Sequence, residues 1–161
     1  MNYRNNLTTL CYLEQNDCYL MLHRTKKVND INEDKWIGIG GHLEDGESPD
    51  ECIEREMAEE CGIKPLNKKL RGVITFVSDK FGSEYIFLYS ADNYEGSLTK
   101  DCPEGDLEWV AKSKVMNLPI WEGDKIFLQL LLENHPFFSL KLCYEGEKLT
   151  YAALDLSLIH I

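Results

Sequence analysis

The sequence predicts an α+β fold in which a mixed β-sheet lies between helices as an α/β/α sandwich. Segments with the composition of strands outnumber segments with helical signals, and the two helical segments fall in the middle of the chain and late in it. Helices and sheets are stable in layers because each buries an apolar face against the other. For a chain of 161 residues we expect one domain over residues 1–161, without internal repeats or linkers.

The expected strands are rich in apolar, β-branched and aromatic residues and are bounded by turn residues. They are residues 7–14, 18–24, 36–44, 70–78, 84–91, 107–111, 137–144 and 148–156. Segment 36–44 alternates large apolar residues with glycine, which suits a strand whose backbone another group approaches closely. The polar segments 25–35 and 92–106 are predicted loops, the first of them next to the site.

The mid-chain helix is defined by local signals at both ends. Ser48 is a natural N-cap, Pro49 suits the first helical position, and Glu51 completes a capping box with Ser48. Gly62 can adopt the left-handed conformation that follows a helix. The sequence therefore predicts a helix from Pro49 to Cys61.

A second helix is expected late in the chain. Pro119 interrupts the chain before it, Asp124 is placed to cap its first turn, and Pro136 stops it after about residue 134. Apolar residues such as Phe127 and Leu130 recur along it at helical spacing and are expected to face a core. On this pattern alone, Asp124 is a helix cap.

Composition restricts the classes of partner. The formal net charge is −11 at pH 7, which argues against a nucleic-acid polymer as partner, because such proteins usually present a basic patch. The six cysteines show no metal-ligand spacing and are interpreted as core residues in a reducing compartment. No apolar run is long enough for a membrane span, so we expect a cytoplasmic protein. An acidic protein that binds an anionic substrate needs a metal ion to offset the repulsion between the two negative charges.

Three carboxylates crowd one edge of the mid-chain helix. At about 100° per residue, Glu56 and Glu60 lie together beside the apolar stripe, and Glu59 lies one step further round. Like charges at this spacing destabilise a bare helix. A divalent cation reverses this effect, because Mg²⁺ prefers carboxylate oxygens and keeps positions open for water and phosphate. The alternative interpretation is a solvated acidic face.

Residues 41–63 place this helix after a glycine-rich turn with a fixed spacing. The pattern consists of Gly41, Glu47, the run Arg55-Glu56-Met57, the pair Glu59-Glu60 and the pair Gly62-Ile63. At every defined position it resembles the signature box of the Nudix hydrolases. The resemblance implies the same α/β/α arrangement and a loop–helix–loop that holds Mg²⁺ or Mn²⁺ against a diphosphate while water attacks phosphorus.

The resemblance also implies roles for single residues. The implied metal ligands and catalytic acids are Glu56, Glu59 and Glu60, together with the carbonyl of Gly41. Arg55, which belongs to the catalytic set, and Glu47 are implied to brace the helix, and Gly62 completes the box. Outside the box, Glu104 lies five residues before Trp109, where relatives often place a Glu that holds a second metal ion or orients water. Without the resemblance, Glu104 would be a solvated acid in a loop.

The implied reaction is hydrolysis of a phosphoanhydride. A carboxylate takes a proton from the attacking water, and Glu59, Glu60 and Glu104 are all candidates that the sequence does not separate. A triphosphate substrate would give pyrophosphate and a nucleoside monophosphate. Arg24, with Lys26 or Lys27, is a candidate for phosphate contacts, although basic residues of exposed loops are usually solvated.

Beyond the box, the chain resembles the MutT-like 8-oxo-purine nucleoside triphosphate diphosphatases. The resemblance rests on Gly72, Phe76, Trp109, the segment PIWEGD at 119–124 and the segment FFSLKLCYEG at 137–146. It implies that Trp121 stacks on the base and that Asp124 reads the purine edge, with Phe76 nearby. Core packing is the alternative for both aromatic residues. The chain departs from the mammalian members at Ile37, where they have an Asn, and at Gly123, where they have an Asp.

Three functions are therefore compared. The first is hydrolysis of an oxidised purine nucleoside triphosphate such as 8-oxo-dGTP, in nucleotide-pool sanitation. The second is hydrolysis of another nucleoside diphosphate derivative, such as a dinucleotide, a nucleotide sugar or a capped RNA 5′ end. The third is a binding protein that has the fold without turnover. The intact acids at 56, 59 and 60 speak against the third, and the PIWEGD segment favours the first. The oligomeric state is not indicated.

Overall fold

The computed structural model of the protein describes residues 6–26, 30–99 and 102–161. Its strands are β1 (Leu7–Gln15), β2 (Cys18–His23), β3 (Trp36–Ile37), β4 (Ile63–Leu66), β5 (Lys69–Ser78), β6 (Gly82–Ala91), β7 (Asn93–Gly96), β8 (Asp106–Ala111), β9 (Phe138–Glu145), β10 (Lys148–Leu154) and β11 (Ser157–Leu158). The helices are α1 (Pro49–Cys61), the short 3₁₀ helix η1 (Val115–Asn117) and α2 (Glu122–Leu132). Among the described residues, no helix is both long and apolar enough to cross a membrane.

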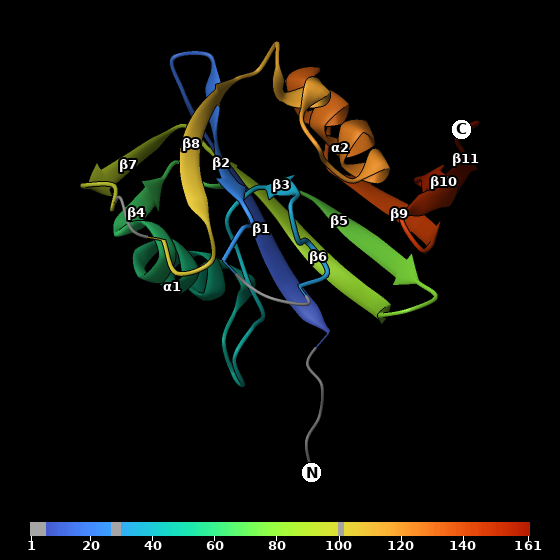
Figure 1. The fold of residues 1–161 in the computed structure, drawn as a ribbon, viewed down its shortest axis with the longest axis horizontal. Helices are drawn as coiled ribbons and strands as arrows, with labels where there is room; N and C mark the ends of the chain where they lie inside the picture. Colours follow the sequence, from blue (N-terminus) through green and yellow to red (C-terminus); the bar gives the residue numbers. More distant parts are fainter. Residues whose placement is uncertain (1–5, 27–29, 100–101) are drawn as a thin grey trace.

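A large mixed sheet organises the fold (Figure 1). Its strand order is β11-β10-β9-β5-β6-β1-β2-β3, and β8 also pairs with β2. β1 is parallel to β6 and β5 is parallel to β9, whereas the neighbouring strands of the hairpins are antiparallel. The expected mixed sheet is therefore confirmed.

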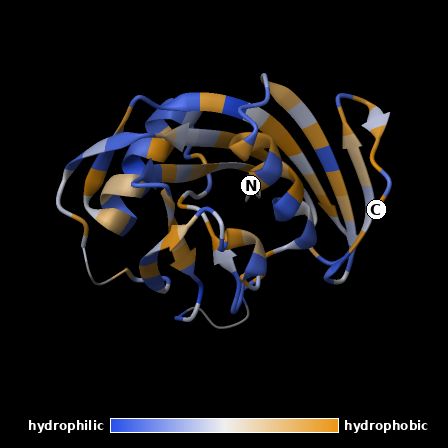
Figure 2. Cartoon of the chain, turned by 90° about the horizontal axis from the view of Figure 1, so that it is seen from above, coloured by the Kyte–Doolittle hydropathy of each residue, from blue (hydrophilic) through white to orange (hydrophobic). Residues whose placement is uncertain are grey.

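Two apolar cores lie on opposite faces of this sheet, one under each helix. In β1, Tyr12 packs into the core that contains Phe127 of α2. Its neighbours Cys11 and Leu13 pack into the core that contains Ile53 of α1. Successive side chains of a strand point to opposite faces, so β1 contributes apolar side chains to both cores. Figure 2 shows hydrophobic residues in the strands of the sheet and in the helices. The structure confirms the α/β/α arrangement.

Helix α1 has the predicted bounds and the predicted caps. The Ser48 side chain accepts a hydrogen bond from the backbone of Glu51, and the Glu51 side chain accepts one from the backbone of Ser48. Gly62 adopts φ 73°, and its N–H bonds to the last turn. The apolar residues Ile53 and Met57 are buried against the sheet. Since both ends and one face are fixed, the acidic edge of α1 is held rigidly.

The prediction that Asp124 caps the second helix is wrong. The helix begins at Glu122, and its N-cap is Trp121, which makes no side-chain capping bond. The backbone N–H of Asp124 already bonds to the carbonyl of Trp121, so Asp124 lies inside the first turn. The Tyr144 hydroxyl, 2.7 Å from the backbone nitrogen of Gly123, accepts a hydrogen bond at this helix end.

The expected strand 36–44 is shorter than predicted. Only Trp36 and Ile37 form β3, and the glycine-rich part that follows meets β1 through single bridges such as Cys11 with Ile39. A Cβ at Gly40 would lie 1.9 Å from the carbonyl oxygen of Thr9. The expected close backbone approach is therefore present, and the approaching group is β1.

The predicted loop 92–106 contains a strand that the sequence analysis missed. Residues Asn93–Gly96 form β7, which pairs antiparallel with β4 directly after α1. This small second sheet was hidden because β4 contains Pro65 and β7 is polar, so neither has a strand-like composition. The pairing holds β4, the segment that directly follows α1, in place.

Candidate active site

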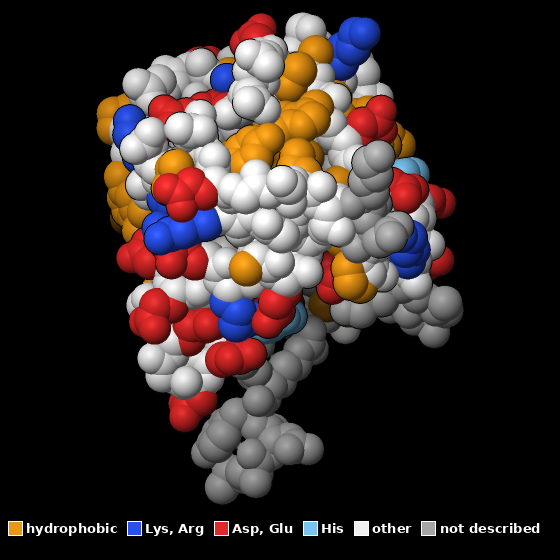
Figure 3. Space-filling model, turned by 90° about the vertical axis from the view of Figure 1, so that its left-hand side faces the viewer, with side chains coloured by type: hydrophobic (Ala, Val, Ile, Leu, Met, Phe, Trp, Pro, Cys, Tyr) orange, Lys and Arg blue, Asp and Glu red, His pale blue; other side chains and the backbone are white. Residues whose placement is uncertain are grey.

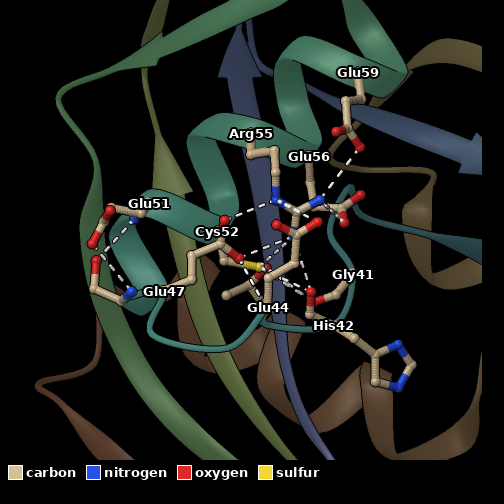
Figure 4. A network of polar contacts seen from close by, with 11 residues as sticks. Gly41, His42, Glu44, Glu47, Glu51, Cys52, Arg55, Glu56 and Glu59 are labelled. Atoms are coloured by element: carbon tan, nitrogen blue, oxygen red, sulfur yellow. Dashed lines mark hydrogen bonds and ion pairs between the residues drawn. The ribbon is translucent and has the colours of Figure 1, made fainter. Parts of the chain in front are cut away.

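Arg55 is the centre of the polar network on α1 (Figure 4). Its Nε and Nη2 donate to the two carboxylate oxygens of Glu47 at 2.8 and 3.0 Å. Nη1 donates to Glu56 at 2.8 Å and to Glu59 at 3.3 Å, and Nη2 also donates to the carbonyl of His42 at 3.0 Å. A two-point guanidinium–carboxylate pair has a defined geometry. Arg55 thus joins the glycine-rich turn to the helix.

The charges of this network affect the two acids differently. Hydrogen bonding to Arg55 lowers the pKa of Glu47 to about 2. Burial raises the pKa of Glu56 above its ordinary value, Arg55 opposes this rise, and the charges of Glu59 and Glu104 add to it. A buried carboxylate among like charges needs additional positive charge to remain ionised. Glu47 is therefore a structural partner of Arg55, whereas Arg55 offsets only part of the effect of burial on Glu56.

Gly41 is the point where the turn touches the acidic helix. A Cβ on this residue would lie 2.5 Å from Oε1 of Glu56, so only glycine leaves room for that carboxylate. The Gly41 carbonyl accepts a hydrogen bond from the backbone of Thr9 at 2.9 Å. The turn is thus attached to β1 on one side and lies against Glu56 on the other.

Glu60 is the most buried acid of the site, with 5% of its surface exposed. Among the residues that the structure describes, its Oε2 atom has no hydrogen-bond partner. Burial, followed by the neighbouring Glu104, raises the pKa of Glu60 well above its usual range. Buried polar atoms are almost always paired, so this oxygen points to a group that binds there.

Glu104 comes from the segment before β8 and is held by Arg24 at the end of β2. Arg24 Nη1 donates to Glu104 at 2.5 Å, and Arg24 Nε donates to Asp30 at 2.7 Å. Arg24 was expected as a candidate for phosphate contacts, but it is buried, and these two carboxylates engage its charge. Lys26 Nζ donates to the carbonyl of Cys102. The other basic candidate, Lys27, lies outside the described residues.

The donor set fits a hard divalent cation. Such ions take carboxylate and carbonyl oxygens. The cavity offers the carboxylates of Glu56, Glu60 and Glu104, and the Glu60 carboxylate contributes the unpaired Oε2 atom. As the described side chains stand, no three acidic, His or Cys groups converge closely enough to enclose an ion. In this arrangement Arg55 binds Glu56, and Arg24 binds Glu104.

A cavity of about 500 Å³ connects these acids with the residues expected to bind the base. Its lining includes Arg24, Ile37, Gly41, Arg55, Glu56, Glu60, Phe76, Glu104, Trp121 and Asp124. Glu59 does not line it, and its side chain is 60% exposed. The cavity therefore brings together these ten expected site residues, whereas Glu59, Lys26 and the two structural residues Glu47 and Gly62 do not line it.

Trp121 lines the cavity from the start of α2, whereas Glu56 and Glu60 line it from α1, and Trp121 is almost fully buried. Its ring packs edge to face against Phe76 at 5.6 Å and Tyr144 at 5.0 Å between centroids, and the Lys35 ammonium lies 4.8 Å from its ring centroid. Its indole N–H donates to Oδ1 of Asn32 at 2.9 Å. Trp121 is therefore both a core residue and a cavity wall, so the two interpretations of the sequence are not exclusive.

Asp124 and Asn32 line the same cavity with polar groups. Burial raises the pKa of Asp124 to about 8, and Lys35 lowers it in part. A carboxyl with this pKa can donate a hydrogen bond near neutral pH. Asn32 was not singled out by sequence reasoning, because it is one polar residue among many in segment 25–35. Only the expectation that this loop lies next to the site pointed towards it.

The surface charge around the site is acidic. Figure 3 shows acidic side chains gathered on the lower part of the face that carries α1, with Lys and Arg side chains scattered among them. This distribution agrees with the net charge of −11. Such a surface repels a polyphosphate anion unless cations accompany it.

A mixed sheet between two helices, with an acidic helix that lines a cavity, defines the class of Nudix-fold hydrolases. The chain belongs to the Nudix hydrolase family, since the NUDIX domain model matches residues 4–131. It is 33% identical over 138 residues to the uncharacterized Nudix hydrolase YvcI of Bacillus subtilis (strain 168), which covers 83% of each chain. The crystal structure of the mutator MutT protein from Bacillus halodurans superposes with a TM-score of 0.82 at 30% identity, covering 92% of this chain and 97% of that one.

Two further similarities concern proteins with named ligands. The chain is 28% identical over 105 residues to the oxidized purine nucleoside triphosphate hydrolase of Danio rerio, which covers 64% of this chain and 66% of that protein. The NUDIX domain of Shewanella oneidensis NrtR, solved with ADP ribose, has a TM-score of 0.66 at 17% identity, covering 83% of this chain and 90% of that one. The second similarity shows the fold alone.

Proposed function

We propose that the protein hydrolyses an oxidised purine nucleoside triphosphate, such as 8-oxo-dGTP, to the nucleoside monophosphate and pyrophosphate, with Mg²⁺ or Mn²⁺. One observation carries the proposal: a single cavity is lined by Glu56 and Glu60 of α1 and by Glu104, and also by Trp121 and Asp124 from the start of α2. A nucleotide has the same two-part chemistry, an anionic phosphate chain and a flat base that stacks and forms hydrogen bonds. The similarity to the Danio rerio enzyme supports the same substrate class.

Glu56, Glu60 and Glu104 would hold the cation, with the carbonyl of Gly41 beside them. Once bound, Mg²⁺ or Mn²⁺ supplies positive charge that offsets the phosphates and favours ionisation of water. Arg55 holds Glu56, and Arg24 holds Glu104, each through a short ion pair. These two arginines keep like-charged carboxylates at one place when no substrate is bound.

The proton of the attacking water goes to a carboxylate that lines the cavity. Of the three candidates from the sequence, Glu60 and Glu104 line it, whereas Glu59 lies outside. Glu59 instead accepts a hydrogen bond from Arg55 at 3.3 Å. We therefore assign proton transfer to Glu60 or Glu104 and assign Glu59 to the outer edge of the metal site.

The base lies against Trp121 and Phe76 in the cavity. An aromatic platform of this kind contributes about 1 to 3 kcal/mol per stacked base. Asp124 adds a polar contact to the purine edge, and Ile37 adds an apolar one. We propose further that the chain acts as one domain in the cytoplasm and removes damaged nucleotides from the precursor pool.

The direct test is a panel of nucleotides incubated with the purified protein and Mg²⁺, with pyrophosphate as the measured product. We expect the fastest release from oxidised guanine triphosphates, and no release with EDTA. Faster turnover of a dinucleotide, a nucleotide sugar such as ADP ribose, or a capped RNA would replace this function by the second one. A complete absence of turnover would favour a binding protein.

A further inference from the structure

Asn32 lines the cavity, and the orientation of its side-chain amide follows from simple chemistry. Its Oδ1 atom accepts the indole N–H of Trp121 at 2.9 Å. The two ends of an amide are hard to distinguish in most structures. Here they are distinguished, because an indole N–H only donates and must face the amide oxygen. The NH₂ group of Asn32 therefore points away from Trp121.

The partner that orients Asn32 is itself fixed. Trp121 is buried and packs edge to face against Phe76 and Tyr144. Lys35 lies over its ring and binds Glu147 at 3.0 Å. A group held by a rigid neighbour loses little conformational freedom when a ligand binds. The indole of Trp121 thus holds the side-chain amide of Asn32 in one orientation.

The loop that carries Asn32 is attached at several points. The Asn32 carbonyl accepts a bond from the backbone of Lys35 at 2.9 Å, and the backbone of Trp36 donates to Pro119 at 2.9 Å. Two residues earlier, Asp30 is bound by Arg24 at 2.7 Å. Asn32 is therefore placed by the backbone and by the indole, on the same wall of the cavity as Ile31.

We propose that Asn32 is a specificity-determining residue that selects a base carrying a carbonyl oxygen over one carrying an amino group at the same edge. The inference rests on the proposed hydrolysis of a purine nucleotide and adds the feature of the base that is recognised. The amide NH₂ donates to a carbonyl oxygen. An amino group at that edge would place two donors face to face and leave both without partners, which disfavours binding.

This role is separate from that of Ile37. The side chain at position 37 lines the cavity but has no hydrogen-bonding group. Asn32 supplies its amide from the loop that precedes β3. The proposed hydrogen bond to a carbonyl oxygen of the base therefore needs no polar residue on β3. Asp124 does not provide the same discrimination, because a protonated carboxyl can both donate and accept.

The test compares dITP with dATP and 8-oxo-dITP with 8-oxo-dATP, pairs whose exocyclic groups differ only in a carbonyl in place of an amino group at C6, with pyrophosphate release as readout. The wild-type protein should prefer the carbonyl member of each pair. Asn32→Asp keeps the oxygen that accepts the indole N–H and removes the NH₂ group. It should lower kcat/KM for the carbonyl substrates by about tenfold or more and raise it for the amino substrates, because an oxygen that accepts from the amino group replaces the clashing donor.

Two more variants separate recognition from folding. Asn32→Ser keeps an acceptor without an NH₂ group and should show the same loss of preference. Trp121→Phe keeps an aromatic ring and removes the N–H, which frees the amide to rotate and should reduce the preference. Asn134→Asp is the matched control, because Asn134 also accepts a side-chain N–H, from Arg71, and does not line the cavity.

The outcomes are distinct for the two proposals. If the wild-type protein prefers the amino bases, or if Asn32→Asp and Asn32→Ser leave the preference unchanged, Asn32 does not read the base. An equal loss for all substrates would assign Asn32 a purely structural role and would also overturn the inference. Absence of turnover for every triphosphate would instead refute the proposed function.

Discussion

Arg24 Nη1 lies 2.5 Å from Oε2 of Glu104, and the guanidinium that makes this contact also binds Asp30. One buried cation therefore connects Glu104 with Asp30 in the loop that carries Asn32. The sequence indicated both Arg24 and Glu104 as candidates for the site but gave no sign that they bind each other. A basic residue expected to meet phosphate has its charge engaged by two carboxylates.

Replacing Arg24 by Gln should both destabilise the protein and reduce its activity. The Asp30 side chain is only 6% exposed, and removal of one partner of a buried ion pair costs about 3 kcal/mol, because the other charge remains buried. Urea unfolding at neutral pH measures the first effect and steady-state kinetics the second. Arg71→Gln, which removes hydrogen bonds to Ser90 and Asn134 away from the cavity, is the control. A stable, fully active Arg24→Gln protein would exclude the proposed coupling.

Replacing Glu60 by Gln should separate activity from stability. The change keeps the shape of the side chain and removes a carboxylate whose pKa is raised by burial. We expect kcat to fall by about a hundredfold or more, while the metal-free protein unfolds at an equal or higher urea concentration at pH 8. Glu54→Gln on the same helix, where the side chain binds Lys68, should be nearly as active as the wild type. Near-normal turnover of Glu60→Gln would remove Glu60 from the site.

Replacing Gly41 by Ala should disrupt the site from the backbone side. The added methyl group would lie 2.5 Å from Oε1 of Glu56, so the carboxylate must move. We expect a loss of kcat with a circular dichroism spectrum like that of the wild type. Gly82→Ala is a useful control, because Gly82 has a φ of 74° and open space around its Cβ position. Gly82→Ala should lose stability without losing activity. If Gly41→Ala kept its activity while Gly82→Ala lost it, the assigned role of Gly41 would be refuted.

Asp124 should make stability depend on pH. Its pKa rises from 3.8 to about 8 on folding, so between these values the folded protein binds a proton that the unfolded chain has released. The free energy of unfolding therefore falls as the pH rises from about 4 to about 8. Asp124→Asn should remove part of this fall, as measured by urea unfolding across that range. An unchanged pH profile would show that the carboxyl is ordinary in the folded protein.

The sequence predicts the acidic helix well because all the determinants of that helix are local. Ser48, Glu51 and Gly62 define its ends, and the structure has the same bounds, Pro49–Cys61. The second helix was predicted less well. At its start the Tyr144 hydroxyl accepts a bond from the backbone of Gly123, and a partner 21 residues away leaves no local signal.

The cavity wall formed by loop 30–35 could not be predicted from spacing. Asn32 meets Trp121 across 89 residues of sequence, and Arg24 meets Glu104 across 80. Such contacts depend on how the strands pair. β8 places Glu104 beside Arg24 only because it pairs with β2. A polar residue in a loop gives no information about these neighbours, which is why Asn32 was missed.

The most direct measurement of the central claim is isothermal titration calorimetry of Mn²⁺ into the protein in the presence of a non-hydrolysable nucleoside triphosphate analogue. We expect saturable binding by the wild-type protein and by Glu54→Gln, and strongly weakened binding by Glu60→Gln, because Glu60 contributes the unpaired buried oxygen of the site. Equal binding by all three proteins, or no binding by the wild type, would contradict the claim that Glu56, Glu60 and Glu104 hold a divalent cation.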